Sequence, residues 1–335
     1  MHQCKTILEF QKAFAYTFLQ ELIDKASTGC DMESSAIDNT RQYTFVSNHR
    51  DIVLDSAFLS KLLIDNGFAT TCEIAIGDNL LSLPWVRDLA RLNKSFIVKR
   101  GLAPRELMQA SVKMARYMIF ALTEKHENLW IAQREGRAKD SNDLTQKSIL
   151  KMFALGAEGT LLERLQQFHV VPLSISYEYD PCDYLKAAEM QAKRDNANWK
   201  KEPMDDVLSM QTGIMGYKGN IHYHAAPCID EYLETLKTTT DMANGPLLAA
   251  ICQHIDKEIH RNYRLYANNY VALDELDGTT IYTNKYSDDN KAKFDAYIEK
   301  QLAKITLPNK DEAYLRQRLL EMYANPARSY LKANA

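Results

Sequence analysis

The segment from residue 44 to residue 55 reads Thr-Phe-Val-Ser-Asn-His-Arg-Asp-Ile-Val-Leu-Asp. Its first three residues form a short aromatic and β-branched run, typical of a buried strand, and the residues after Asp55 are typical of an apolar helix. The polar turn around His49 therefore lies where a strand ends. In open α/β sheets ligands bind at the carboxyl ends of the strands, so this turn predicts both the fold class and the place of a functional site.

Four further β-rich runs follow this segment and alternate with helical stretches. The predicted strands cover residues 44–46, 72–76, 96–98, 129–132 and 170–176, and the predicted helices between them cover residues 56–66, 104–125 and 147–167. Strands that alternate with helices indicate parallel pairing through crossover connections. We therefore expect an α/β fold with a mostly parallel central sheet flanked by helices.

Helical additions are expected at both ends of the chain. Residues 5–26 have apolar side chains at three- and four-residue steps, which predicts a helix packed on the core, and residues 27–41 are expected to form a polar loop. Residues 218–225 predict one more strand or hairpin arm, and further helices are predicted at 184–194, 231–238, 246–263, 289–304 and 311–322. The expected division is an N-terminal helix and loop (1–40), an α/β core (41–230) and a helical C-terminal extension packed on the core (231–335).

The composition excludes several classes of protein. The 335 residues include 41 Lys and Arg against 44 Asp and Glu, a net charge of −3, which argues against a dedicated nucleic-acid-binding protein. The longest run without a charged residue covers residues 242–255 and is shorter than the roughly 20 residues that a membrane-spanning helix needs. The first residues lack the apolar stretch of a secretory signal, and the six cysteines include no Cys-x-x-Cys pair, so we expect a cytoplasmic protein with reduced thiols.

Polar and basic residues follow the predicted strands on their carboxyl side. The third and fourth strands are followed by Lys99, Arg100, Glu135, Gly136, Arg137 and Lys139. If the strands are parallel, these residues share one edge of the sheet with His49. A histidine base beside several cations suits a phosphate-bearing substrate, because Arg and Lys donate charge-assisted hydrogen bonds to phosphate. The alternative is a surface histidine held by the polar groups of its own loop.

Four blocks between residues 43 and 180 resemble, in order, those of the glycerolphosphate acyltransferase superfamily. The blocks are Asn48-His49-Arg50-Asp51 with Asp55; Gly77, Asn79 and Leu80 with Phe96, Lys99 and Arg100; Glu135-Gly136-Arg137 with Lys139; and Val171-Pro172 through Tyr177-Glu178. Each block is weak alone, and the order and spacing of all four make the resemblance specific. The chain departs from the family pattern by placing Asp55 six rather than five positions after His49, and by having Gln133-Arg134 before Glu135.

The resemblance implies transfer of a fatty acyl group from acyl-CoA or acyl carrier protein to a hydroxyl of glycerol 3-phosphate or a monoacylglycerol phosphate, in phospholipid biosynthesis. It implies His49 as general base, Asp55 as its partner, and substrate contacts from Arg50, Asn79, Lys99, Arg100, Glu135, Gly136, Arg137 and Lys139. No metal and no cofactor is implied beyond the thioester co-substrate. The expected partners are the thioester donor and the phosphorylated acceptor, with the inner face of the membrane as an open addition and no nucleic acid.

Two alternatives remain open on the same scaffold. One is O-acylation of another lipid acceptor, such as an amino-acid lipid. The other is a catalytically silent module that binds an acyl carrier or a lipid. An intact His49 with carboxylates nearby argues against the silent module.

Two carboxylates are candidates to orient the imidazole of His49. We expect Asp55 to be the partner, because a helix that starts near Asp51 points Asp55 back toward the histidine, and we expect Asp51 to cap that helix. Elsewhere, His222 and His224 share one face of a predicted strand, where a structural role is favoured over a metal site. The Met-rich helix over residues 107–122 is expected to pack in the core, with a groove for an acyl chain as the alternative.

Overall fold

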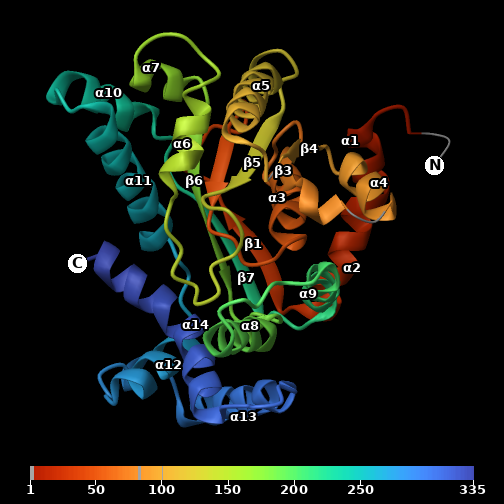
Figure 1. Ribbon diagram of the computed structural model, residues 1–335, viewed down its shortest axis with the longest axis vertical. Coiled ribbons are helices and arrows are strands. Elements are labelled where there is room, and N and C mark those ends of the chain that lie inside the picture. Colours follow the sequence, from red (N-terminus) through yellow and green to blue (C-terminus); the bar gives the residue numbers. More distant parts are fainter. Residues whose placement is uncertain (1–3, 82–83, 100) are drawn as a thin grey trace.

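The computed structural model describes residues 4–81, 84–99 and 101–335 and is built around a seven-stranded sheet (Figure 1). The strands are β1 (Gly29–Glu33), β2 (Thr44–Ser47), β3 (Cys72–Gly77), β4 (Ser95–Val98), β5 (Asn128–Ala132), β6 (Val170–Tyr177) and β7 (Asn220–Ala225), in the order β1-β7-β6-β2-β5-β3-β4. Neighbouring strands are parallel except β6 and β7, so β1 and β7 run opposite to the other five. The predicted α/β class with a mostly parallel sheet is confirmed.

Strand β2 lies in the middle of this sheet. Its Thr44 is paired with Leu129 of β5 on one side and with Val170 of β6 on the other, and all four residues of β2 are buried. Because β2, β3, β4, β5 and β6 are parallel, the turns that follow them open on one edge of the sheet, which we call the carboxyl edge. The sequence-predicted site residues all follow strands that end there.

Helices cover both faces of the sheet and bury its alternating side chains. One face packs against α2 (Tyr16–Ala26) and α3 (Leu54–Asp65). The other face packs against α5 (Pro104–Thr123), α6 (Lys147–Phe153), α7 (Leu161–Gln166), α10 (Asp230–Thr239) and α11 (Asn244–Arg261). Phe45 and Val46 of β2 belong to these two different cores, since successive side chains of a strand point to opposite faces.

The N-terminal helix forms as predicted, with one irregular turn. A π-helical segment (Gln11–Ala15) joins α1 (Ile7–Phe10) to α2. The apolar face of α2 is buried against the sheet, whereas Phe14 and Phe18 are 44% and 59% exposed. No helix within the described residues is long and apolar enough to cross a membrane.

The last third of the chain builds a second group of helices beside one end of the sheet (Figure 1). A third core is formed by α8 (Asp183–Asp195), α12 (Ala267–Asp277), α13 (Asp288–Ala303) and α14 (Glu312–Ala333). At its centre the carboxylate of Asp183 accepts hydrogen bonds from the phenols of Tyr297 and Tyr323, both at 2.7 Å, and from the amide of Gln301 at 2.6 Å. Burial nevertheless raises the pKa of Asp183 to about 7.

Some elements differ from the sequence prediction. Residues 29–33 form the edge strand β1 and not a loop. The sequence did not indicate this strand because its residues are polar and partly exposed and therefore show no apolar alternation. The helix predicted over residues 147–167 is two helices, α6 and α7, separated by a segment that contains Gly156 and Gly159. Helices α4 (Pro84–Leu92), α9 (Pro203–Met215) and α12 were not predicted. The division at residues 40 and 230 stays a prediction.

Candidate active site

The turn after β2 is fixed to the neighbouring strands on both sides. The side-chain amide of Asn48 donates to the carbonyl of Ile175 and accepts from its N–H, both at 2.8 Å, so it extends the pairing of β2 with β6. On the other side, the indole of Trp130 donates to the hydroxyl of Ser47 at 3.0 Å. The ring of His49 lies edge-on to Trp130, with 5.5 Å between ring centroids. The imidazole is therefore held in one place.

His49 and Asp55 form a buried hydrogen-bonded pair. The Nδ1 atom of His49 is 2.8 Å from Oδ2 of Asp55, and the same oxygen accepts the backbone N–H groups of Arg50 at 2.6 Å and Asp51 at 3.0 Å. The His49 side chain is 13% exposed and that of Asp55 is fully buried. A carboxylate oxygen only accepts, so Nδ1 carries the shared proton and Nε2 keeps a free lone pair. This is the arrangement of a general base with an orienting carboxylate.

Asp51 has a different position from Asp55. Its Oδ1 atom accepts the N–H groups of Val53 at 2.9 Å and Leu54 at 2.8 Å, which caps the start of α3. Burial and the nearby charge of Asp55 raise the pKa of Asp51. Its Oδ2 atom faces α9, where a Cβ atom added to Gly213 would lie 1.9 Å away. The structure thus places Asp55 against the imidazole and Asp51 at the helix cap.

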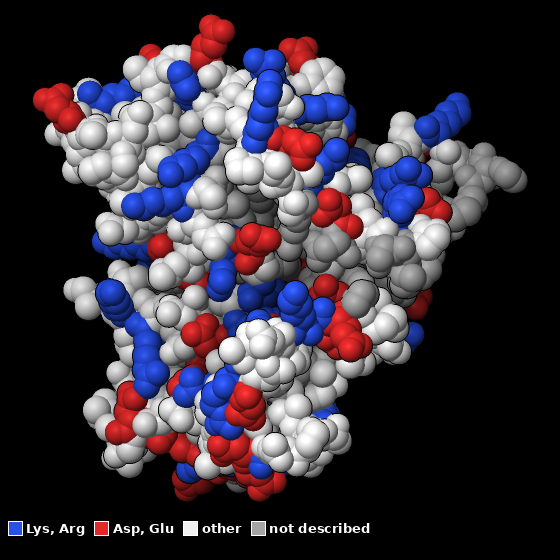
Figure 2. Space-filling view, in the orientation of Figure 1, with Lys and Arg blue, Asp and Glu red and all other residues white. Residues whose placement is uncertain are grey.

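A cavity of about 1490 Å³ opens at the carboxyl edge beside His49. Six of the residues predicted for the site line it: His49, Lys99, Glu135, Gly136, Arg137 and Lys139. Much of the remaining wall is apolar and comes from α4, α5 and α9, including Leu89, Met114, Tyr117, Met210 and Ile214. The volume exceeds the roughly 300–1000 Å³ of most small-molecule sites. Figure 2 shows this face of the molecule hollowed near its middle, with Lys and Arg side chains in the hollow.

Arg137 and Lys139 bring two cations into the cavity close to each other. Between Glu135 and Arg137, Gly136 has a φ of 68°, a conformation that glycine adopts readily. The Arg137 side chain is buried, and its Nη1 atom has no hydrogen-bond partner among the described residues. Burial, with Arg137 nearby, lowers the pKa of Lys139 to about 8, although Lys139 pairs with Glu189 at 2.7 Å. Two desolvated cations in one wall favour the binding of an anion.

Arg50 does not line the cavity, in contrast to its predicted contact with substrate. Its Nη1 atom lies 2.9 Å from the carboxylate of Asp143, and its guanidinium lies 5.6 Å from the centre of the Tyr263 ring. Both charged side chains are buried. The backbone N–H of Arg50 faces Asp55, and the side chain leaves the turn toward the buried carboxylate of Asp143. Arg50 therefore supports the turn from inside the fold.

Two further predicted residues have no side-chain description. Asn79 lies in a 3-10 helix (Asp78–Leu81) directly after β3, and its side chain is outside the described part of the structure. Arg100 is outside the described residues altogether. Lys99, its neighbour, follows β4 and lines the cavity.

Several residues of the cavity were missed from the sequence. Lys193 of α8 and Lys201, two residues before α9, also line it, as do apolar side chains of α9. They come after the four sequence blocks, and nothing in their spacing links them to His49. On α5, Met118 packs in the core as expected, whereas Met114 and Tyr117 line the cavity. The Met-rich helix therefore packs in the core on one side and lines the cavity on another, and a groove for an acyl chain stays a prediction.

The alternating histidines of β7 are engaged in polar contacts away from the cavity. His222 Nδ1 lies 3.1 Å from Oδ2 of Asp31, whose carboxylate also pairs with Arg264 at 2.9 Å. The rings of His222 and His224 are 6.2 Å apart, and burial lowers the pKa of both.

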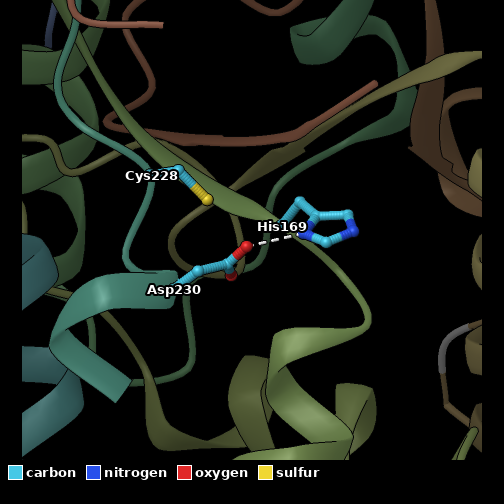
Figure 3. A group of neighbouring side chains, drawn as sticks. All are labelled: His169, Cys228 and Asp230. Carbon is cyan, nitrogen blue, oxygen red and sulfur yellow. Dashed lines mark hydrogen bonds and ion pairs between the residues drawn. The ribbon is translucent and has the colours of Figure 1, made fainter. Parts of the chain in front are cut away.

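A group of three potential metal ligands, which includes one histidine, lies at the opposite edge of the sheet (Figure 3). His169, directly before β6, and Cys228 and Asp230, after β7, have potential ligand atoms within 4.8 Å of one another. The His169 Nδ1 atom is 2.6 Å from Asp230 Oδ2, and the guanidinium of Arg41 approaches these two atoms to 3.5 and 3.9 Å. A positive charge already faces the carboxylate, so we assign this cluster no catalytic part.

Comparisons with known proteins bear on the residues that form the cavity. Residues 31–176 match the family model described as Acyltransferase. No curated protein sequence matches the chain. Among solved structures, the chain is similar to the 1-acyl-sn-glycerophosphate (LPA) acyltransferase PlsC from Thermotoga maritima, with 13% identity over 74% of this chain and 82% of that chain and a TM-score of 0.36, a likeness too distant to carry an assignment. The family match over residues 31–176 agrees with the resemblance to the glycerolphosphate acyltransferase superfamily and with the prediction of an O-acyltransferase.

Proposed function

We propose that the protein moves a fatty acyl group from acyl-CoA or acyl carrier protein to a hydroxyl of glycerol 3-phosphate or a monoacylglycerol phosphate, in phospholipid biosynthesis. The observation that carries the proposal is that His49, held by Asp55, lines one large and mostly apolar cavity together with Arg137 and Lys139. A base, an anion site and room for an acyl chain then meet in one place. These are the three needs of acyl transfer to a phosphorylated alcohol.

The proposed reaction uses Nε2 of His49 as the base. As the acceptor hydroxyl attacks the thioester carbonyl, Nε2 takes the hydroxyl proton and a carbon–oxygen bond forms. The tetrahedral intermediate then collapses, the carbon–sulfur bond breaks, and the departing thiolate takes the proton back from the imidazolium. Asp55 keeps the proton on Nδ1 and stabilises the imidazolium through its negative charge. The reaction needs no acyl-enzyme and no cofactor beyond the thioester donor.

Arg137 is the proposed main contact for the acceptor phosphate, assisted by Lys139. Arg presents a planar fork that matches two phosphate oxygens, and one nitrogen of this fork has no hydrogen-bond partner among the described residues. The wall formed by Met114, Tyr117 and Met210 would hold the acyl chain. Which thioester serves as donor is left to the assay.

The mouth of the cavity supports a proposed contact with the inner face of the membrane. Several of the residues that line the cavity are also large, apolar and exposed: Leu89 (44%), Ile97 (51%), Leu107 (46%) and Met215 (72%). A lipid acceptor that leaves a bilayer would meet apolar side chains at this rim. Flotation of the protein with vesicles of anionic and of neutral lipid tests the contact, and protein that stays at the bottom of both gradients would contradict it.

The test of the function is the release of free thiol by purified protein. Acyl-CoA and acyl carrier protein are each offered with glycerol 3-phosphate, a monoacylglycerol phosphate, or an amino-acid lipid. His49→Ala should lower kcat by about 10²–10⁴, the usual worth of a general base. His169→Ala is the matched control, because it removes a histidine of another His–Asp pair at the opposite edge. Turnover of the amino-acid lipid alone would identify the other acceptor, and binding of the donor without turnover would identify a silent module.

A further inference from the structure

The cavity is not completed by the family-matched region alone. Residues 31–176 supply His49, Arg137 and Lys139, but one wall comes from α8, α9 and the segment between them. Lys193 and Lys201 belong to this wall. The part of the chain that carries no family motif therefore forms part of the substrate cavity.

The cations of this wall meet those of the family-matched region. The carboxylate of Glu189 on α8 forms ion pairs with Lys139 and Lys193, both at 2.7 Å. Lys201 forms an ion pair with Asp206. With Arg137, this makes four cations against the carboxylates of Glu189 and Asp206, while Asp51 and Asp180 lie near Arg137. Among the described residues that line the cavity, seven are Lys or Arg and two are Glu or Asp, so the lining as a whole carries an excess of positive charge. A phosphate monoester carries up to two negative charges and matches it.

Helix α9 holds this wall at a fixed position relative to His49. Gly213 lies directly against the carboxylate of Asp51, in the same turn that carries the histidine, and a Cβ there would approach Oδ2 to 1.9 Å. The thiol of Cys182 also contacts the backbone carbonyl of Ser209 at 3.3 Å, which ties α9 to the start of α8. Lys201 thus reaches the cavity from the segment that leads into α9, and α9 is packed on the turn that carries His49.

We propose that Lys193 and Lys201 form, with Arg137 and Lys139, one joint site for the phosphate of the acceptor, so that α8 and α9 determine acceptor choice. This inference rests on the proposed function for the identity of the acceptor. The rival source of the same chemistry is the phosphate of the donor, in CoA or in the prosthetic group of acyl carrier protein. We favour the acceptor because this group of cations reaches the turn that carries His49, beside which the attacking hydroxyl has to lie. Arg137 interacts with Asp51 of that turn, Lys139 interacts with Arg137 and Lys201, and Glu189 joins Lys139 to Lys193.

The experiment compares Lys193→Gln with Lys201→Gln in one double variant against Lys293→Gln. Lys293 on α13 pairs with Asp289 at the same i,i+4 spacing as Lys193 with Glu189, and it lies outside the cavity. The double variant should raise the KM for the phosphorylated acceptor about tenfold or more, the worth of a charge-assisted hydrogen bond, and leave the KM for the donor and the melting temperature nearly unchanged. With a monoacylglycerol that lacks the phosphate, the double variant and the wild type should turn over alike.

Binding measurements separate this inference from the proposed function. Calorimetric titration with glycerol 3-phosphate should show weaker binding to the double variant than to the wild type and the Lys293→Gln control, whether or not thiol is released. If the wild type binds the phosphate but never turns over, the proposed function fails and the joint phosphate site stands. A rise in donor KM alone, or equal affinity of the double variant and the wild type for glycerol 3-phosphate, would overturn the joint site.

Discussion

Asp55→Asn tests whether Asp55 acts on the His49 imidazole through its hydrogen bond or through its negative charge. From the structure we expect the orientation of the imidazole to be kept and the charge to be lost. Oδ2 of Asp55 accepts hydrogen bonds from Nδ1 of the imidazole and from the backbone N–H groups of residues 50 and 51. The other oxygen, Oδ1, is buried without a hydrogen-bond partner in the described part of the chain. Backbone N–H groups can only donate, so the carbonyl oxygen of the new asparagine takes the Oδ2 position and its NH₂ group takes the other. The imidazole then keeps its Nδ1 proton, and only the negative charge is lost.

The size of the effect follows from that charge. With about 4 Å between charge centres and an effective dielectric constant of about 20, the carboxylate and the imidazolium attract each other by about 4 kcal/mol. Each 1.36 kcal/mol of barrier changes the rate tenfold, so Asp55→Asn should lower kcat by up to about 10³. Asp55→Ala should cost at least as much activity. It should also lower the free energy of unfolding by about 1–3 kcal/mol, because two backbone N–H groups lose their acceptor.

Two measurements decide the matter. Thiol release gives kcat, and ¹⁵N NMR of histidine-labelled protein reports which ring nitrogen of His49 carries the proton. Asp51→Asn is the companion variant: asparagine caps helices about as well as aspartate, so kcat should fall less than about threefold. If Asp55→Asn keeps more than a third of the wild-type kcat, or if its His49 carries the proton on Nε2, the reasoning from the backbone donors is wrong.

Three other variants test separate features. Arg137→Lys should raise the acceptor KM far more than the donor KM, because Lys lacks the planar fork, and equal rises would place Arg137 against the donor. Gly213→Ala should cost about 1–3 kcal/mol of stability or displace the turn and lower kcat, since its Cβ meets Asp51, whereas Gly245→Ala, with open space around it, should do neither. Asp183→Asn tests the network between α8 and α14. The folded-state pKa of Asp183, about 7, lies above its unfolded value, so its contribution to stability is present at low pH and is lost as the pH rises toward 7. In urea titrations the variant should therefore gain stability relative to the wild type between pH 5 and pH 8, and a pH-independent difference would contradict this.

The parts of the molecule that the sequence predicts well are those in which the signal is local. The β2 segment, the turn and α3 follow one another within 22 residues, and the cap by Asp51 and the return of Asp55 depend only on the geometry of a helix start. Lys99, Arg137 and His49 line the same cavity because they follow parallel strands, whose carboxyl ends share one edge of the sheet. Chemistry placed at strand ends can therefore be located from the amino-acid sequence alone.

What could not be predicted depends on partners that lie far away in sequence. Arg50 stands next to the histidine, but its guanidinium is directed by Asp143, a carboxylate in a loop after β5. The edge strand β1 is polar, and its strand form comes from pairing with β7, nearly two hundred residues later. Neither case leaves a periodic pattern in the sequence. The direction of the Arg50 side chain depends on a nearby buried carboxylate, and the strand form of β1 depends on a nearby free strand edge.

The two sides of the cavity differ in how far their structure can be predicted from local sequence. The side with His49 must keep sub-ångström relations among a base, a carboxylate and backbone donors, and these relations are built within one turn, where few residues suffice and a family motif can record them. The side with Lys193 and Lys201 has only to place positive charge and apolar surface at the right distance, which many helices could do. Binding energy on that side affects which acceptor is held, while the reacting atoms are handled on the other. Exchange of α8 and α9 between relatives should therefore change the preferred acceptor with little change in the dependence on His49.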